Sequence, residues 1–237
     1  MNNKKAIPGF LLVLITVCGV YAQQQDSEKD FQTELADGGK SVNIVYYAGE
    51  NTTVRIPGRI NNLPVTGINE GAFMDSGISG VAIPDGVTAI MAYAFSGNII
   101  TSVSFPNSVA SIGEKAFFRN KLAALTLPNS VKSVGKEAFA VNGIASLTIP
   151  NGVTFIGERA FAFNKLTSVT IPNSVSVIEG EAFAGNQITR ITIGENVELK
   201  FSAESQGPFE GGFADFYNSN RRKAGTYTFS GGRWSAG

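Results

Sequence analysis

The chain of 237 residues contains no histidine, and its single cysteine is Cys18. Without histidine there is no Ser-His-Asp triad, no histidine general acid or base, and little scope for a zinc site. Beyond Cys18 the chain can form neither a disulfide nor a thiolate nucleophile. These absences argue against most common enzyme chemistries, and we expect no cofactor and no metal.

Charge is scarce too. Charged residues make up 16% of the sequence, and 19 basic residues balance 19 acidic ones. Such a surface carries no electrostatic footprint for nucleic acid or acidic lipid. Glycine-rich phosphate loops, calcium loops and dinucleotide fingerprints are also missing. At 43% hydrophobic residues, however, the chain can bury a substantial core.

Residues 1–22 are typical of a secretory signal peptide. Lys4 and Lys5 precede the apolar run from Ile7 to Val17, and a small-residue site ends at Ala22. The run is shorter than the roughly 20 residues of a transmembrane helix, and no later segment is longer. Cleavage after Ala22 and lipidation at Cys18, as in a bacterial lipoprotein, are the two alternatives. Both predict a secreted or cell-surface protein.

The main positive feature is a repeat of 22 residues. Phenylalanines preceded by alanine recur at this interval, at Phe73, Phe95, Phe117, Phe139, Phe161 and Phe183. Counted from each phenylalanine as position 1, large apolar residues recur at positions 6, 9, 11, 15 and 18. A fixed period of this length is typical of a solenoid, in which these residues line one interior. We assign the repeats to residues 73–194.

Positions 9 to 11, such as Val169-Thr170-Ile171, alternate apolar and polar residues and are rich in β-formers, which predicts a short strand followed by a turn at Pro-Asn or Pro-Asp. The predicted fold is a β-rich solenoid of parallel stacked coils. It has one main parallel sheet, short turns or 3-10 segments on the other side, and a cap at each end. Stacking also brings opposite charges together, because positions 20 and 21 alternate in sign, as in Glu114, Lys136 and Glu158.

The repeat Asx-x-Leu-x-x-Val-x-Ile-Pro-Asn-x-Val-x-x-Ile-Gly-x-x-Ala-Phe resembles the BspA-like leucine-rich repeat family of bacterial surface proteins, over residues 41–237. Ile56 lies 27 residues before Ile83, which indicates an N-terminal cap and first coil over residues 41–72, with a five-residue insertion covering the open end. Residues 23–40 are polar and predict a flexible linker. The resemblance implies adhesion or binding of a host protein, without catalytic residues.

The repeat pattern fails after Gly194, where Lys200 occupies a position expected for an interior isoleucine. Residues 195–237 are rich in glycine and aromatic residues and are interpreted as a C-terminal cap; a ligand-binding aromatic site is the alternative. Residues 216–229 resemble a hairpin, with a basic cluster near its turn. This cluster is a secondary contact candidate: Arg221, Arg222 and Lys223.

An asparagine recurs at position 4, at Asn98, Asn120, Asn142, Asn164 and Asn186. Stacked asparagines usually satisfy backbone groups in successive coils, and we prefer this interpretation to a ligand row. The match of Ser133-Val-Gly-Lys136 to a Ser-x-x-Lys nucleophile motif is a by-product of the repeat, because neighbouring repeats have Glu114 and Glu158 in place of the lysine.

The remaining candidate is a surface. Positions 8 and 10 of each strand should face outward, and they are mostly small and neutral. The candidate partner-binding residues are Ser102, Ser104, Thr126, Ser146, Thr148, Ser168, Thr170, Arg190 and Thr192, with Ala124 in the same row. A rigid face of this kind suits an extracellular protein partner, such as a host matrix or plasma protein. The alternative is a passive envelope protein in which these residues only favour strand formation.

Overall fold

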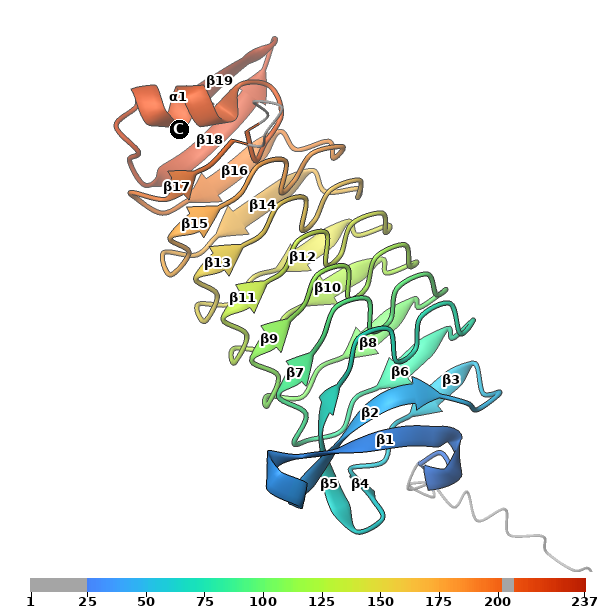
Figure 1. Cartoon of the computed structure of the whole chain (residues 1–237). Coiled ribbons are helices and arrows are strands. Elements are labelled where there is room, and N and C mark those ends of the chain that lie inside the picture. The colour runs from blue at the N-terminus through green and yellow to red at the C-terminus, as the bar shows by residue number, and fades with distance from the viewer. Residues whose placement is uncertain (1–24, 202–206) are drawn as a thin grey trace, which may run out of the picture.

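The computed structural model describes residues 25–201 and 207–237, and these form a tall stack of coils capped at both ends (Figure 1). The predicted solenoid of parallel stacked coils is confirmed. The leader, with both of its processing alternatives at Cys18 and Ala22, lies outside the described residues.

Each coil contributes one strand to a first parallel ladder. Its members are β3 (Thr53–Arg55), β6 (Gly80–Ala82), β8 (Ser102–Ser104), β10 (Ala124–Thr126), β12 (Ser146–Thr148), β14 (Ser168–Ile171) and β16 (Arg190–Ile193). Between repeats the pairing advances by one period, as in Ala124 opposite Ser146. β3 pairs with β6 at the longer spacing expected of the N-terminal insertion, with Val54 opposite Val81.

A second parallel ladder runs along the other side of the stack (Figure 1). It comprises β5 (Leu63–Ile68), β7 (Ala89–Ile90), β9 (Ser111–Ile112), β11 (Ser133–Val134), β13 (Phe155–Ile156), β15 (Val177–Ile178) and β17 (Glu198–Leu199). Short turns follow the repeat strands on this side as predicted, for example at residues 114–117, but the two-residue strands themselves were not predicted. Within the described residues, the 3-10 helices η1 (Glu28–Asp30) and η2 (Asp37–Gly39) both precede the first repeat.

Glycine allows the coils to approach closely beside this second ladder. A Cβ atom at Gly135 would lie 2.7 Å from the backbone carbon of Gly113 in the coil below. Only a residue without a side chain fits at that separation. Gly113, Gly135 and Gly157 therefore allow backbone to pack against backbone at position 19, whereas Met91 and Glu179 occupy this position in other coils.

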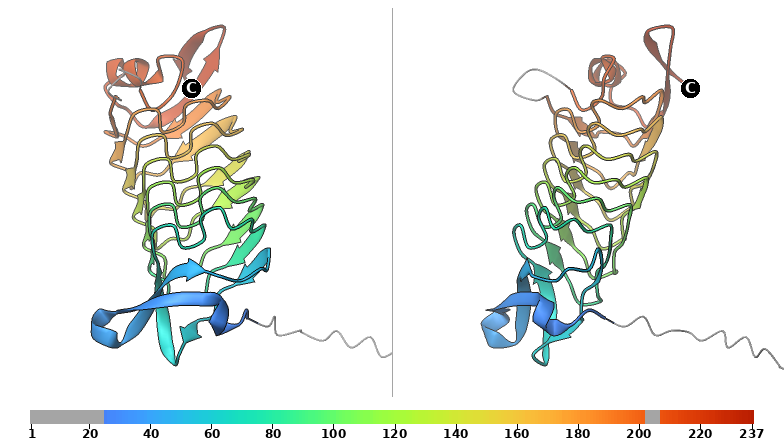
Figure 2. Two further views of the ribbon diagram at one scale, coloured as in Figure 1. Left: turned by 45° about the vertical axis from the view of Figure 1, so that its right-hand side comes forward. Right: turned by 90° about the vertical axis from the view of Figure 1, so that its right-hand side faces the viewer.

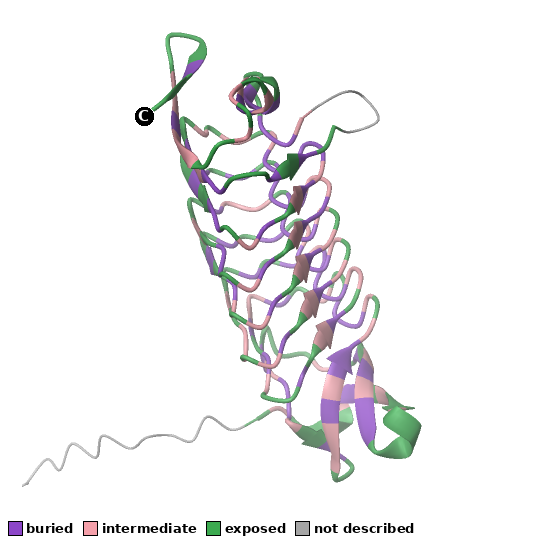
Figure 3. Cartoon of the chain, turned by 90° about the vertical axis from the view of Figure 1, so that its left-hand side faces the viewer, coloured by how far each residue is buried: buried purple, intermediate pink, exposed green. Residues whose placement is uncertain are grey.

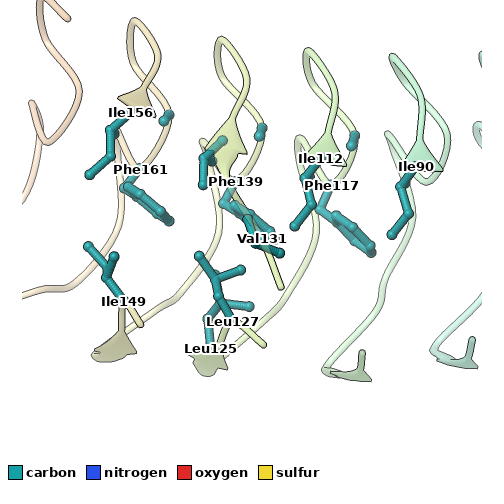
Figure 4. Packing of buried hydrophobic residues seen from close by; sticks show 14 of the residues in the cluster. Ile90, Ile112, Phe117, Leu125, Leu127, Val131, Phe139, Ile149, Ile156 and Phe161 are labelled. Atoms are coloured by element: carbon teal, nitrogen blue, oxygen red, sulfur yellow. The ribbon is translucent and has the colours of Figure 1, made fainter. Parts of the chain in front are cut away.

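A column of phenylalanine rings forms the centre of the core. The six repeat phenylalanines are at most 1% exposed, and adjacent rings stack with centroid separations between 4.8 Å for Phe73 with Phe95 and 5.7 Å for Phe139 with Phe161. Figure 4 shows these rings facing the aliphatic side chains of both ladders, such as Leu125, Leu127 and Ile156. The predicted interior positions thus form one continuous core.

Two other predicted ladders are confirmed at the corners of the coils. The side-chain amide of Asn164 donates to the carbonyls of Phe139 and Phe161, both at 3.0 Å, and its oxygen accepts from the Ile144 N–H. The alternating charges form ion pairs between coils. Lys136 lies 3.1 Å from Glu158, and Arg159 lies 2.6 Å from Glu181.

The N-terminal end differs from the prediction. β1 (Phe31–Ala36) and β2 (Ser41–Tyr47) form an antiparallel hairpin, and β2 pairs with β5. The buried rings of Phe31 and Tyr47 extend the phenylalanine column beyond Phe73. A flexible linker over residues 23–40 is therefore wrong for residues 28–40, because Phe31 is anchored in the core. The insertion itself forms β4 (Arg59–Ile60), which pairs with β5.

At the C-terminal end the segment between β16 and β17 is one residue shorter than in the preceding coils. Leu199 pairs opposite Ile178 and is buried, whereas Lys200 is exposed. The deletion explains why the pattern appears to place a lysine in the core. The Phe209 ring then stacks on Phe183 at 4.8 Å and continues the column.

The hairpin predicted over residues 216–229 is wrong. α1 (Phe213–Ser219) occupies the first part of this segment, and a connection leads into β18 (Gly225–Ser230). The hairpin lies further along, between β18 and β19 (Arg233–Ala236), and turns at two glycines with φ of 57° and 78°. β18 also pairs with β16, so this end adds two antiparallel strands to the first ladder.

Candidate functional site

The outward face of the first ladder is the predicted binding surface. Strands in this ladder alternate buried and exposed residues, so that Val169 is buried between the exposed Ser168 and Thr170. Nine of the ten residues at positions 8 and 10 from β8 to β16 are exposed, and Thr192 is half-buried. Figure 3 shows the same alternation of buried and exposed segments along the coils. The side chains therefore point away from the core, as the alternation predicts.

Pairing registers align these residues into rows. Thr126 is opposite Thr148, and Thr170 is opposite Thr192. The ladder is divided into three sheets, with interruptions after β8 and β12. Backbone hydrogen bonds still connect the coils there, from Lys121 N–H to the Ile100 carbonyl and from Lys165 N–H to the Ile144 carbonyl, both at 2.9 Å. The rows thus stand on one bonded framework.

Neutral side chains dominate this face. Of the ten outward positions only Arg190 is charged, and it lies on the last repeat strand. Serine and threonine hydroxyls can both donate and accept hydrogen bonds, and their short side chains lose little conformational entropy on binding. The face can therefore contact a partner closely without desolvating charges.

The C-terminal hairpin extends this face, which the sequence analysis missed. Arg190 is opposite Thr228, and Thr192 is opposite Thr226, with their hydroxyl oxygens 2.9 Å apart. Ser235 follows on β19, opposite Thr228. The signal was the alternation of hydroxyl and aromatic residues in Thr226-Tyr-Thr-Phe-Ser230, but the pairing partner could not be read from it.

The basic cluster is less accessible than expected. Arg221 and Lys223 are exposed, but Arg222 is half-buried, and its guanidinium donates to the side chain of Asn218 at 3.0 Å. The cluster lies between α1 and β18 rather than at a hairpin turn. The two exposed cations, Arg221 and Lys223, are a weak recognition feature on their own.

Lys136 is poorly suited to act as a base. Its hydrogen bond to Glu158 raises the pKa of its ammonium group above the ordinary value, whereas a lysine base needs a lowered pKa. The group is exposed on a salt-bridge ladder. In the described ranges, no three or more cysteine or acidic side chains gather closely enough to hold a metal ion.

Over the same ranges, none of the helices has the length and apolar character needed to cross a membrane. A stack of short-stranded coils around a central apolar column, with asparagine and charge ladders at its corners, defines a leucine-rich-repeat solenoid protein. The family model described as "BspA type Leucine rich repeat region" matches residues 66–190 with six copies. This chain belongs to that family.

Solved structures show the same fold. A leucine-rich repeat protein of T. pallidum shares 26% identity with a TM-score of 0.62, covering 75% of this chain and 86% of that chain. A leucine-rich cell surface protein from Faecalibacterium prausnitzii shares 23% identity with a TM-score of 0.55, covering 90% of this chain and 60% of that one. No curated protein matches the chain.

The pneumococcal vaccine antigen PcpA is also similar in fold. It shares 20% identity with a TM-score of 0.58, and the match covers 74% of this chain. The aligned part is only 50% of PcpA. The similarity therefore concerns the solenoid alone.

Proposed function

We propose that this protein is secreted or held at the bacterial cell surface and that the outward face of its first ladder binds an extracellular protein, such as a host matrix or plasma protein. The observation that carries the proposal is the alignment of exposed, neutral hydroxyl side chains over successive bonded coils. Support also comes from the repeat family and from the solenoid of a cell surface protein of similar fold.

Rigidity is the physical reason for this choice. Association loses free energy through the ordering of loops and long side chains, but the strands of this face are already fixed by pairing with a neighbouring strand and by backbone hydrogen bonds between coils. Solenoids present extended surfaces of this kind to protein partners. Neutral rows with a single terminal Arg190 favour a partner surface rich in backbone and polar groups over a highly charged one.

The test measures binding of the purified protein to a panel of extracellular matrix and plasma proteins. A triple variant, Thr126→Lys, Thr148→Lys and Thr170→Lys, places three long cations in the central rows. The matched control is Thr88→Lys, Thr154→Lys and Ser176→Lys. These exposed residues lie at position 16, where Lys132 already stands. Circular dichroism establishes that both variants are folded.

We expect the ladder variant to lose saturable binding and the control to retain it. Binding that survives in the ladder variant would contradict the assignment of the face and direct attention to Arg221 and Lys223. Absence of binding by the unmodified protein to every panel member would instead favour the passive envelope role.

A further inference from the structure

The solenoid starts a seventh repeat and leaves it incomplete. Phe209 takes position 1, and Glu210 and Gly211 take positions 2 and 3. Gly211 has a φ of 70°, close to the 68° of Gly185 one coil below. Gly185 N–H donates to the Glu210 carboxylate at 2.7 Å. In the coil below, Phe163 N–H donates to the backbone carbonyl of Ala184 instead. The chain then turns at Gly212 into α1, so no asparagine follows at position 4.

Because the asparagine is missing, the backbone groups that it would bond have lost that partner. In the coil below, Asn186 accepts from the Leu166 N–H at 3.0 Å and donates to the Phe161 carbonyl at 2.9 Å. The equivalent groups of the last coil are the N–H of Ile188 and the carbonyl of Phe183. Within residues 25–201 and 207–237, the Ile188 N–H has no hydrogen-bond partner, and the Phe183 carbonyl accepts only from Asn186.

These groups border a cleft with a volume of about 380 Å³, which is in the size range of small ligand sites. Its lining includes Phe183, Gln187, Ile188, Phe209, Phe229 and Trp234. α1 and the β18–β19 hairpin stand above the last coil on separate sides (Figure 2).

A buried donor in the cleft wall also has no partner. Trp234 is only 7% exposed, and across the described part of the chain its indole Nε1 makes no hydrogen bond. Buried polar groups are nearly always paired. Because Nε1 is closed off from solvent, an acceptor oxygen in the cleft can reach it only if the indole turns toward the cleft.

We propose that this terminal cleft binds an extended peptide segment of another protein through an asparagine whose carboxamide takes the place of the side chain that Gly212 lacks at position 4 of the incomplete repeat. Its carboxamide oxygen accepts from the Ile188 N–H, and its amide nitrogen donates to the Phe183 carbonyl. An aliphatic residue two positions later packs against Phe209 and Phe229, as Leu166 follows Asn164 within a repeat. A peptide carbonyl accepts from Trp234 Nε1 after the indole turns toward the cleft. This site is separate from the hydroxyl rows of the first ladder.

Trp234 is the only tryptophan of the chain, so its fluorescence reports on this cleft. The probe is a peptide with the sequence of residues 161–170, FAFNKLTSVT, acetylated and amidated. Two further peptides carry aspartate or alanine in place of the asparagine. We expect a saturable change in emission with the asparagine peptide and at least about fivefold weaker binding of the alanine peptide, which lacks two hydrogen bonds.

Two substitutions locate the binding. Thr189→Arg extends a long side chain at the cleft lining, and Thr167→Arg is the matched control at the same position one coil earlier. We expect the first to abolish the response and the second to preserve it. Trp234→Phe, assayed by calorimetry, should weaken binding roughly threefold to tenfold through loss of one donor.

Three results would overturn the proposal: no saturable response to the asparagine peptide, equal affinity for all three peptides, or unchanged binding by Thr189→Arg. Titration with N-acetylglucosamine oligomers tests whether the cleft binds a saccharide that carries amide groups instead of a peptide. A response to the sugar without one to the peptide would assign the cleft to a saccharide and refute a peptide partner.

Discussion

The carbonyl oxygen of Phe139 accepts hydrogen bonds from two side-chain amides, Asn142 in its own coil at 3.1 Å and Asn164 in the next coil at 3.0 Å. Each asparagine thus fastens one coil to its neighbour while closing its own turn. Because these amides are largely buried, the stability of the stack should depend on them strongly.

Asn164→Ala should therefore lower the free energy of unfolding by about 2 to 4 kcal/mol, since it leaves the Ile144 N–H without its partner and removes one of the two donors to the Phe139 carbonyl. Urea denaturation followed by circular dichroism measures the loss. Asn164→Asp retains the acceptor but not the donor, and an intermediate loss is expected. A midpoint unchanged in the alanine variant would show that water replaces the amide at no cost.

Phe139→Ala should cost about 3 to 5 kcal/mol, because it opens a cavity in the ring column. Phe163→Ala is the internal comparison, since the Phe163 side chain is 56% exposed, and we expect a much smaller loss. Thermal melting of both variants checks the difference. Equal losses would contradict the assignment of the repeat phenylalanines as the central column.

Val141 is the least favourable backbone position of the repeats. It is β-branched and has a φ of 57°, whereas glycine occupies the equivalent place at Gly97 and Gly185. Val141→Gly should raise stability by about 1 kcal/mol through relief of strain. The reverse change, Gly185→Val, should destabilise, because its Cβ would lie 2.5 Å from the Phe163 ring. Chemical denaturation decides whether the two changes have opposite signs.

Burial raises the pKa of the Tyr217 and Tyr227 hydroxyls above their ordinary value of 10.0. Above pH 10 the unfolded chain releases these protons while the folded chain keeps them. The free energy of unfolding therefore decreases as the pH rises. Stability should be constant below about pH 9 and fall above pH 10. Tyr217→Phe should make that fall shallower in melts recorded between pH 8 and pH 11.

The period of the repeat was enough to predict the column, the register and the interior positions, because every coil repeats the same contacts. Features that depend on one coil alone could not be predicted. The second ladder rests on strands of two residues, such as Ser133–Val134, which are too short to show alternation. Leu199 replaces an expected isoleucine only through a deletion, and Phe31 anchors a segment whose composition is otherwise polar.

The candidate surfaces likewise include one part that the sequence predicts and another that depends on the three-dimensional structure. Exposure of Thr126 and Thr148 follows from alternation within a strand, which the sequence shows directly. The addition of Thr226 and Thr228 depends on an antiparallel pairing with β16, set by the path of α1. The terminal cleft arises where an asparagine is missing. Only the stacking of the coils shows which backbone groups lack the hydrogen bonds that this asparagine would make.

Every internal coil presents nearly the same upper and lower surface to its neighbours, and the caps contact only the ends. Duplication or loss of one 22-residue unit would therefore lengthen or shorten the protein by one strand spacing of about 4.8 Å without altering either end. The length of the solenoid can therefore change during evolution in uniform steps, while the terminal cleft remains at its C-terminal end.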